Sequence, residues 1–308
     1  MSNSLGLIIP TFRSGEKIVV SLEAIFAANY TPKCLTIVNN SPDTPIHEKA
    51  IEILSKLRLI KDIDVKIIDE PKTGLTNARR RGVFETQADI VVFIDDDNAI
   101  SADYLNEGLL LMEDAEIGML ASMVIPYYYE GKPSVAVLKR DYLLGNNYFL
   151  GDKKIDFGAI ATMAPTNGAG MWIRRELLIE IFDNNEVLLP DRTGDQLTSG
   201  GDGEIGFMVG KRGYRRVYHP GLKITHWIPA SRASYNYFLR LISGCIYSDF
   251  AQRRRYGIFG FKFRINQFAK AIFNLILSPI CFLATGDKWE LGFRLQAAKS
   301  ILRNLLIK

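Results

Sequence analysis

Three adjacent carboxylates are the first residues of this chain whose types and spacing suggest chemistry. Asp95, Asp96 and Asp97 lie in the string "FIDDDN", directly after residues 88–94, an apolar run rich in β-branched side chains. Such a run predicts a strand buried on both faces of a parallel sheet. Because neighbouring like charges repel, the aspartates need a cation, hydrogen-bond donors or solvent. The alternative is a structural role, since aspartate is also common in turns and at helix N-caps.

The first half of the chain alternates between predicted strands and helices. The strands are 5–10, 34–39, 64–69 and one ending at Asp95, and the helices are 15–28, 45–59 and 73–85. This spacing indicates βαβ units and a doubly wound α/β sheet. The four strands end in the polar strings "PTFRSGE", "NNSPD", "DEPKTG" and "DDDN". Because ligands bind at the carboxyl ends of such strands, we expect a nucleotide pocket there.

The second half is less regular and divides into two parts. The string "TNGAGMWI" predicts a loop that leads into a strand and then a short helix, "RRELLIEIF". A polar loop follows, then a helix ending near Gly213 and two short strands, 214–219 and 222–227. Beyond residue 231 the chain reads as helical and basic. We therefore predict a catalytic domain over 1–230 and a C-terminal region over 231–308.

Composition is that of a globular protein, with 308 residues, 47% of them hydrophobic and 23% charged. The three cysteines, Cys34, Cys245 and Cys281, are far apart and odd in number. This excludes a disulfide framework and a cysteine zinc site, and it indicates a reducing compartment. The first residues lack a basic segment followed by a long apolar stretch, so we expect no signal peptide.

Charge is divided unevenly along the chain. Residues 231–308 carry 13 basic and three acidic side chains, a net charge of +10, whereas residues 1–230 carry 25 and 31, a net charge of −6, and the sum is +4. This asymmetry indicates an anionic partner for the C-terminal region. A membrane surface is favoured over nucleic acid, because no nucleic-acid-binding module accompanies the charge.

The segment 253–286 mixes arginines, aromatic residues and an apolar run, 271–284. As a helix, this run would be about 21 Å long, shorter than the roughly 30 Å hydrocarbon core of a bilayer. We therefore expect the segment to lie in the interface of an anionic leaflet as a peripheral contact. The alternatives are a helix packed on the catalytic domain or buried in a homodimer.

Two other motifs are excluded by their context. The string "GDGEIG" at 201–206 matches the dinucleotide-binding fingerprint, but it follows a polar loop and not a strand. A calcium-binding EF-hand that began at Asp95 would need a ligand at Ala99 and a glycine at Ile100. Carboxylates beside phosphate oxygens and water suit Mg²⁺ or Mn²⁺ instead.

Over residues 4–230 the chain resembles the inverting glycosyltransferases of family 2, which have the GT-A fold. The resemblance rests on six strings in the family's order: "IIPTFRSGEKIVVSLEAI", "IVNNSPD", "GLTNARRRG", "FIDDDN", "NGAGMWIRRELL" and "GGDGEIGFMVGKRGYR". It implies a doubly wound mixed sheet with helices on both faces, followed by the helical basic C-terminal region. It also implies inverting transfer, dependent on Mn²⁺ or Mg²⁺, of a sugar from a nucleoside-diphosphate sugar, most readily a UDP-sugar.

The resemblance assigns roles to residues at matching positions. Asp202 becomes the catalytic base, and the metal ligands are Asp97, Asp95 and His226. A lone histidine after a strand also often has only a structural role. The residues expected to bind the nucleotide sugar are Pro10, Thr11, Phe12, Arg13, Asn39, Asn40, Gly74, Arg79, Asp95 and Asp96. Those expected near the donor or acceptor sugar are Asn167, Gly168, Ala169 and Glu204, and Arg232 is expected at the diphosphate.

Three positions depart from the family pattern. Asn39 stands where an aspartate usually precedes the asparagine of the base-reading loop, which leaves the donor base open. Gly201 replaces a glutamate, and Met208 stands where an arginine is common. Because of these changes, one alternative function stays open, that of a sugar-nucleotide-binding membrane scaffold that has lost catalysis. The other alternative, a sugar nucleotidyltransferase, would be expected to carry a glycine-rich phosphate loop, which "PTFRSGE" fits poorly.

The expected acceptor is a hydroxyl of a glycan or lipid-linked glycan, as in polysaccharide biosynthesis. Together with the basic C-terminal region, this predicts a location at the cytoplasmic face of the cell membrane.

Overall fold

The structure is a computed structural model that describes residues 3–13, 15–161, 167–184, 189, 191–193 and 197–307. The chain forms two compact units. The first spans the described parts of 1–127, 145–188 and 201–227, and the second spans those of 128–144, 189–200 and 228–308. The predicted domain boundary at residue 230 stays a prediction.

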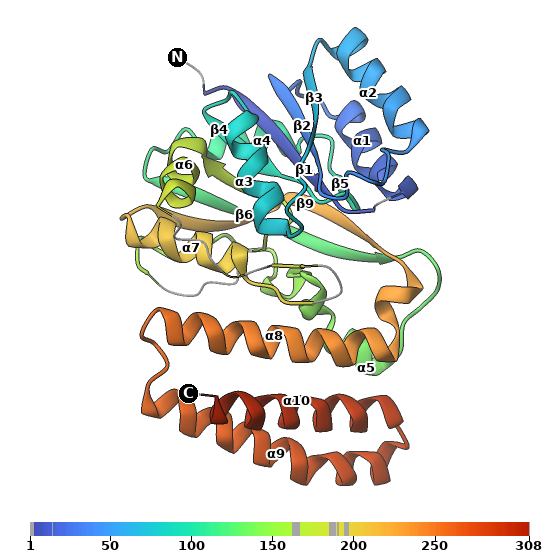
Figure 1. The fold of residues 1–308 in the computed structure, drawn as a ribbon, viewed down its shortest axis with the longest axis vertical. Helices are drawn as coiled ribbons and strands as arrows, with labels where there is room; N and C mark the ends of the chain where they lie inside the picture. The colour runs from blue at the N-terminus through green and yellow to red at the C-terminus, as the bar shows by residue number, and fades with distance from the viewer. Residues whose placement is uncertain are drawn as a thin grey trace. The chain divides into compact units, whose positions relative to one another are not determined.

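The first unit is built on a mixed sheet with the strand order β3-β2-β1-β4-β8-β6-β9-β5, and β7 pairs with β9 (Figure 1). The strands are β1 Leu5–Thr11, β2 Cys34–Asn39, β3 Asp64–Asp69, β4 Ile90–Phe93, β5 Asn98–Ile100, β6 Ile117–Tyr128, β7 Ile155–Asp156, β8 Met171–Arg174 and β9 Arg215–Ile228. Strands β1 to β4 are parallel, whereas β8 is antiparallel to both β4 and β6.

Helices cover both faces of this sheet. They are α1 Ile18–Ala27, α2 Glu48–Lys61, α3 Leu75–Glu85, α4 Tyr104–Leu111, α6 Arg175–Asp183 and α7 Gly201–Lys211. Leu7 and Ile9 of β1 lie in a buried core with residues of α1, α2 and α4. Ile8 points to the opposite face, where α3 approaches so closely that a Cβ at Gly82 would lie 2.5 Å from Ile8 Cγ2. The predicted mixed sheet with helices on both faces is thus confirmed.

Several elements differ from the sequence-based prediction. The two strands expected at 214–219 and 222–227 are one continuous strand, β9, which passes through Pro220. Its residues pair with β7 near its start and with β5 near its end, and these partners keep the chain extended throughout. Strands β5 and β6 were not predicted from the sequence.

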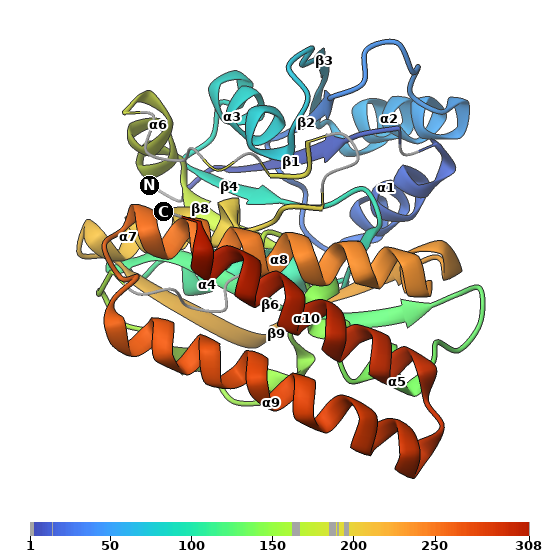
Figure 2. The same ribbon diagram turned by 60° about the horizontal axis from the view of Figure 1, so that its bottom comes forward.

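The second unit is helical and contains α5 Val135–Leu138, α8 Tyr235–Arg255, α9 Phe261–Thr285 and α10 Lys288–Leu306. Helix α10 lies alongside both α8 and α9 in Figures 1 and 2. A small buried cluster made of Phe250, Ala271, Ala298 and Ile301 joins the three helices. The predicted helical C-terminal region is confirmed.

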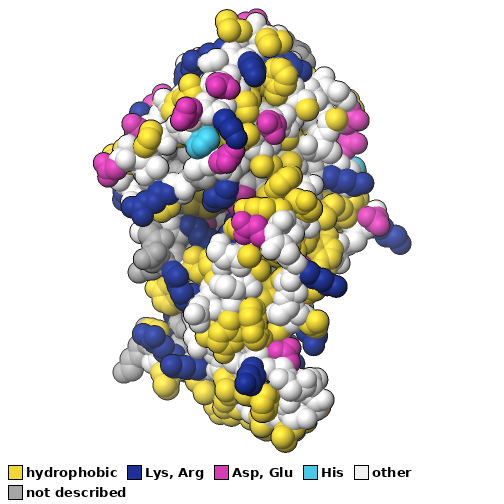
Figure 3. Space-filling view, turned by 90° about the vertical axis from the view of Figure 1, so that its right-hand side faces the viewer, with side chains coloured by type: hydrophobic (Ala, Val, Ile, Leu, Met, Phe, Trp, Pro, Cys, Tyr) yellow, Lys and Arg dark blue, Asp and Glu magenta, His cyan; other side chains and the backbone are white. Residues whose placement is uncertain are grey.

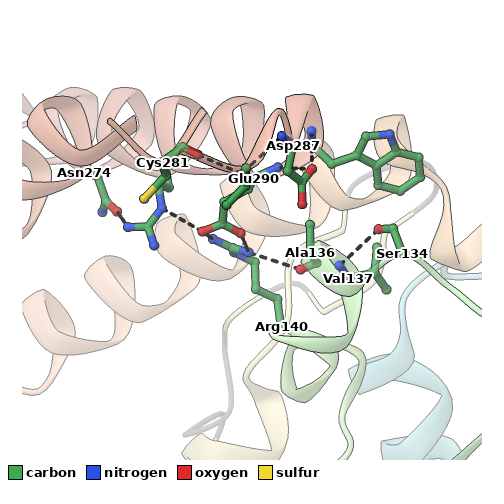
Figure 4. Close-up of polar contacts among 11 residues, drawn as sticks. Ser134, Ala136, Val137, Arg140, Asn274, Cys281, Asp287 and Glu290 are labelled. Carbon is green, nitrogen blue, oxygen red and sulfur yellow. Dashed lines mark hydrogen bonds and ion pairs between the residues drawn. The ribbon is translucent and has the colours of Figure 1, made fainter. Parts of the chain in front are cut away.

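A buried ion-pair cluster fixes the start of α10 against α5 (Figure 4). Glu290 accepts two hydrogen bonds from the Arg140 guanidinium, at 2.6 and 3.0 Å, and one from Arg294 Nε at 2.7 Å. The hydrogen bonds from Arg140, followed by the charges of both arginines, outweigh burial and lower the pKa of Glu290 to about 2. Asp287 caps the helix by accepting the N–H groups of Trp289 and Glu290.

Helix α9 is longer than the apolar run suggested. Its 25 residues correspond to about 38 Å, because the helix begins ten residues before the apolar run 271–284. By length and composition alone it is long and apolar enough to cross a membrane. The sequence-based argument that the helix is too short to span a bilayer is therefore wrong.

Candidate active site

The loop after β4 carries the three aspartates and is held by helix α1. Ser21, which is fully buried, donates its hydroxyl to the Asp95 carbonyl at 2.9 Å and accepts the N–H of Asn98 at 3.1 Å. The same N–H lies 3.1 Å from the Asp95 carbonyl. The strand therefore ends in a tight turn whose position is set by a neighbouring helix.

The three carboxylates have different surroundings. Asp95 is half-buried. Asp96 accepts the Thr11 hydroxyl at 2.8 Å, and burial, followed by the charge of Asp97, raises the pKa of Asp96 to about 6. Asp97 is only 5% exposed, and its Oδ1 accepts Asn98 Nδ2 at 3.0 Å. Crowding of this kind favours a bound cation, which would offset the repulsion between the carboxylates.

His226 faces Asp97, although the two residues are 129 positions apart in the sequence. The antiparallel pairing of β5 with β9 places His226 opposite Asn98, and the N–H of Trp227 donates to the Asp97 carbonyl at 2.9 Å. As a result, His226 Nε2 lies 3.6 Å from Asp97 Oδ1, and both side chains are 6% exposed. The other ring nitrogen, Nδ1, lies 3.1 Å from Oδ1 of Asn146.

Asn146 was not identified from the sequence. Its only signal there is its place in "LGNNYF", a pair of asparagines between apolar residues. Asparagine is usually exposed, so the pair by itself does not indicate buried positions. That both side chains are buried and hydrogen-bonded follows only from the sheet around them.

The side chains of this corner supply part of the ligand set of a divalent cation. Within the described ranges, no group of three or more His, Cys, Asp or Glu side chains is arranged to hold a metal. Asp97 and His226 nevertheless offer one carboxylate oxygen and one imidazole nitrogen at neighbouring positions. This pair suits Mn²⁺, which accepts both ligand types, if diphosphate oxygens and water complete the coordination. The residues present therefore fit a cation that is held partly by the protein and partly by a nucleotide.

The carboxyl ends of β1 and β2 lie side by side, since Pro10 pairs with Val38 and Thr11 with Asn39. After β1 the chain turns at Arg13, a residue in the left-handed region with φ of 50°. Its N–H donates to the Ser41 hydroxyl, and its guanidinium lies 5.2 Å from the centre of the Phe12 ring. Phe12 is 40% exposed, so this edge presents an aromatic ring and a cation to solvent.

Asn39 and Asn40 hold the neighbouring loops with their side chains. Asn40 donates to the carbonyls of Glu70 and Lys72 and accepts the N–H of Gly74 at 2.7 Å. Asn39 donates to Asp69 Oδ1 and to the Thr44 carbonyl, and it accepts from Ser41. Their amides are thus occupied in holding the loops at this edge of the sheet.

The arginines of "GLTNARRRG" separate into one buried and two exposed side chains. Arg79 is 3% exposed and its guanidinium lies 5.5 Å from the centre of the Phe93 ring. Arg80 and Arg81 face solvent, where Arg81 pairs with Glu85. Gly74, at φ of 133°, precedes the helix that carries them. Of these three arginines, only Arg79 therefore reaches the interior of the unit.

The proposed base, Asp202, lies in the first turn of α7. Both of its oxygens accept backbone N–H groups: Oδ2 from Gly168 at 2.7 Å and Oδ1 from Gly203 at 2.8 Å. Gly168 in turn lies against Arg79, since a Cβ at this glycine would be 2.0 Å from Arg79 Nη2. The structure thus brings together Asp202, Gly168 and Arg79 from three separate strings of the sequence.

The remaining predicted residues are distributed around this loop, with one exception. Asn167 donates its amide to the Gly145 carbonyl at 2.5 Å, and Ala169 is half-buried. Glu204 is fully buried. Arg232 lies in the second unit, in the short helix η4 Ala230–Ala233. There it and Arg192 outweigh the effect of burial on Tyr237 and lower the pKa of that phenol.

The family and structural comparisons give the following matches. The sequence model of the family described as "Glycosyl transferase family 2" matches residues 7–182, more than half of the chain. A mannosyltransferase from Pyrobaculum calidifontis, PcManGT, solved with GDP-Man and Mn²⁺, is 15% identical with a TM-score of 0.62, and the match covers 99% of this chain and 88% of that one. TarS 1–349 from S. aureus, solved with UDP-GlcNAc, is 15% identical with a TM-score of 0.51, covering 78% and 66%. No curated protein matches.

These structural similarities concern the fold. The chain spans 66% of the TarS fragment and 39% of a longer TarS structure, to which it is also 15% identical, with a TM-score of 0.48. The predicted GT-A-like α/β fold is confirmed by the mannosyltransferase, which matches nearly the whole chain.

Proposed function

The chain belongs to glycosyl transferase family 2 and is a glycosyltransferase, and from this premise we propose the reaction that it catalyses. A sugar passes from a nucleoside-diphosphate sugar to a hydroxyl of a glycan or lipid-linked glycan, with inversion at the anomeric carbon. The observation that carries this proposal is the buried pair of Asp97 and His226 beside the carboxyl ends of parallel strands. Nucleotide ligands bind at such strand ends.

Asp97 and His226 would hold the divalent cation, with Asp95 beside them. A cation bound there supplies charge stabilisation for the departing nucleoside diphosphate. The mannosyltransferase with the same fold was solved with GDP-Man and Mn²⁺, which supports a nucleotide-sugar donor and this metal. A UDP-sugar remains the preferred donor from the sequence resemblance, with a GDP-sugar as the alternative that the mannosyltransferase supports.

Asp202 would accept the proton of the acceptor hydroxyl as that oxygen attacks. Its two backbone hydrogen bonds fix the direction of the carboxylate, and a positioned base contributes about 10²–10⁴-fold in rate. Asn167, Gly168, Ala169 and Glu204 belong to the surrounding loop and helix start, next to the sugar sites. Arg232 is proposed to contact the diphosphate.

The donor nucleotide would lie along the ends of β1, β2 and β4. The residues proposed to line or shape its site are Pro10, Thr11, Phe12, Arg13, Asn39, Asn40, Gly74, Arg79, Asp95 and Asp96. Phe12 offers an exposed ring for base stacking and Arg13 a cation. Asn39 and Asn40 act through the loops that they hold.

The acceptor is proposed to be presented at the cytoplasmic face of a membrane, for polysaccharide biosynthesis, with segment 253–286 in peripheral contact. Of the 25 residues of α9, only Ala271 and Ser278 are buried. Large exposed apolar side chains recur along the helix, mostly at three- and four-residue steps, and in Figure 3 yellow side chains lie along the lower edge, where Figure 1 places α9. This apolar stripe consists of Phe261, Ile265, Phe268, Ile272, Phe273, Leu275, Ile276, Ile280 and Leu283.

Charge supports a lipid surface as the partner of the apolar stripe. Helix α9 contains Lys262, Arg264 and Lys270 and no acidic residue, and five residues separate it from Arg253, Arg254 and Arg255 at the end of α8. An apolar stripe flanked by cations binds the interface of an anionic leaflet.

The packing of α10 favours a helix that lies flat over one that crosses the bilayer. Helix α10 runs beside α9 and carries Lys288, Glu290, Arg294, Lys299 and Arg303. A crossing α9 would carry these charges into the hydrocarbon core, which is costly.

The reaction is tested by nucleoside diphosphate release from a panel of UDP- and GDP-sugars, with Mn²⁺, with Mg²⁺ and with EDTA. We expect slow hydrolysis of one donor, only when metal is present. If no donor is turned over with either metal while nucleotide still binds, the chain is a binding protein without catalysis and the proposed reaction is wrong.

Membrane contact is tested by co-sedimentation with anionic and neutral vesicles. The variant Phe268→Ser/Ile272→Ser/Ile276→Ser should lose binding to anionic vesicles. The control Leu59→Ser/Ile60→Ser/Leu110→Ser removes three apolar residues of the first unit that are more exposed than those three, and it should bind like wild type. If wild type binds neither kind of vesicle and forms a dimer, and the α9 variant is a monomer, the apolar stripe is a dimer interface and the proposed membrane contact is wrong.

A further inference from the structure

Asn146 is a buried asparagine whose side chain faces the candidate metal ligand His226. It is 1% exposed, and its Oδ1 lies 3.1 Å from His226 Nδ1. The neighbouring Asn147 ties this segment to β6, since it donates to the Ser122 carbonyl and accepts the Val124 N–H, both at 2.7 Å. The backbone at Asn146 is therefore tied to β6 through its neighbour.

When Oδ1 of the Asn146 amide faces His226, this contact sets which ring nitrogen carries the proton. An amide oxygen can only accept, so Nδ1 must donate to it. In the neutral ring the lone pair then lies on Nε2, which is 3.6 Å from Asp97 Oδ1. In the neutral form two acceptors thus face each other where both side chains are 6% exposed, and a cation that binds both atoms makes this arrangement favourable. A doubly protonated ring would instead donate from Nε2 to Asp97.

The reverse orientation of the amide would have the opposite consequence. Its NH₂ group would donate to Nδ1, the ring proton would lie on Nε2, and this nitrogen would face Asp97 as a donor. A histidine in that tautomer cannot bind a metal through Nε2. The two orientations therefore predict different proton positions and different metal affinities.

We propose that Asn146 is a positioning residue that keeps the His226 proton on Nδ1 and so leaves Nε2 available to the divalent cation. This inference rests on the proposed metal-dependent function and adds to it a residue that contacts neither metal nor substrate. Outer hydrogen-bond partners of ligating histidines typically change metal affinity by about 10–100-fold when removed.

The first test measures Mn²⁺ affinity by electron paramagnetic resonance of the free ion, with Mn²⁺ alone and with added UDP or GDP. Asn146→Ala should weaken Mn²⁺ binding by about 10–100-fold. Asn146→Asp should bind Mn²⁺ nearly as well as wild type, because a carboxylate also accepts the Nδ1 proton. The control Asn304→Ala removes an equally buried asparagine of the second unit and should leave the affinity unchanged.

The second test reads the tautomer directly, without metal, from ¹⁵N-labelled histidine by NMR. The chain has only three histidines, and the spectrum of His226→Gln identifies the signals of His226. Wild type should show the proton on Nδ1, and Asn146→Ala should shift population toward the Nε2-protonated form. A role limited to packing would leave this ratio unchanged.

The two tests separate failure of this inference from failure of the proposed function. The inference is wrong if Asn146→Ala keeps the wild-type tautomer and binds Mn²⁺ with an affinity within about threefold of wild type. The smallest loss of affinity that the inference predicts is about tenfold. A proton on Nε2 in wild type, with binding lost in both Asn146 variants, would also overturn it. If wild type binds no Mn²⁺ even with nucleotide, the metal-dependent function fails, and the tautomer measurement still decides what Asn146 does.

Discussion

The corner around Asp97 and the corner around Asp202 hold their carboxylates in different ways. Asp97 is fixed through strand pairing, with its carbonyl accepting the Trp227 N–H and its side chain facing His226. Asp202 is fixed by two backbone N–H groups, from Gly203 beside it and from Gly168 in a distant loop. The first corner is part of the sheet, whereas the second depends on how one loop meets the start of a helix.

This difference suggests a division of roles. A cation site needs ligands at fixed separations, and a sheet register supplies them. A general base needs a fixed direction with one oxygen able to reach the substrate, and hydrogen bonds to backbone groups orient it without a competing side-chain charge. Four substitutions test whether the two corners act separately.

The largest effect is expected for Asp202→Asn. Because the amide cannot accept the proton of the acceptor hydroxyl, transfer should fall by about 10²–10⁴-fold. The measurement is kcat for sugar transfer, alongside Mn²⁺ and nucleotide affinity, which should not change. Near-normal turnover in this variant would contradict the assignment of the base.

Asp97→Asn should act on binding first. Loss of a direct ligand should weaken Mn²⁺ binding by at least about 10–100-fold, and donor affinity should fall with it. Saturating Mn²⁺ should restore part of the activity of Asp97→Asn and none of that of Asp202→Asn. Equal responses of the two variants to added metal would remove the distinction between the corners.

Gly168→Ala should disturb the surroundings of Asp202 and leave those of Asp97 unchanged. The new Cβ would lie 2.0 Å from Arg79 Nη2, so either the loop or the arginine must move. We expect a loss of about 1–3 kcal/mol in unfolding free energy from overpacking, with kcat reduced and Mn²⁺ affinity kept. Gly131→Ala places a Cβ in open space in the second unit and is the control; its φ of 118° adds backbone strain without a clash.

Glu290→Gln measures how a loss of stability alone affects the two corners. Removing the charge that Arg140 and Arg294 share should cost about 1.5–3 kcal/mol at neutral pH, while leaving Mn²⁺ affinity and kcat unchanged below the melting temperature.

The pH dependence of this effect follows from the pKa of Glu290. Since its folded pKa, about 2, is below the ordinary value of 4.5, the stabilisation is present above pH 4.5 and is lost as the pH falls toward 2. Urea unfolding of both proteins should give a difference that shrinks over this range. A difference that does not depend on pH would show that the charge is not its cause.

Much of the first unit was predictable because its signals are local. An apolar run such as 34–39 predicts a strand that is covered on both faces, and a polar string such as "DDDN" predicts its end. Both signals lie within a few neighbouring residues of the sequence. The basic, apolar C-terminal region was equally evident from composition. The family resemblance was also contained in short strings, and the match over residues 7–182 agrees with it.

Other features were decided by contacts between distant residues. The sequence suggested a break in 214–219 and 222–227 at Pro220, but pairing with β7 and β5 keeps β9 continuous. Residue type does not separate the three neighbouring arginines. The family resemblance singled out Arg79, and the structure buries it against Phe93 and Gly168.

The sequence by itself determined the class of fold, the position of the carboxylates at a strand end and the asymmetry of charge, because each depends on neighbours along the chain. The family resemblance placed Asp97 and His226 together as metal ligands, whereas the tertiary structure alone revealed their contact geometry and that Asn146 faces His226. Those contacts follow from the register of β5 on β9 and from the tie between Asn147 and β6. Register is set by the packing of the whole sheet, since a shift of one residue would turn every side chain of a strand to the other face.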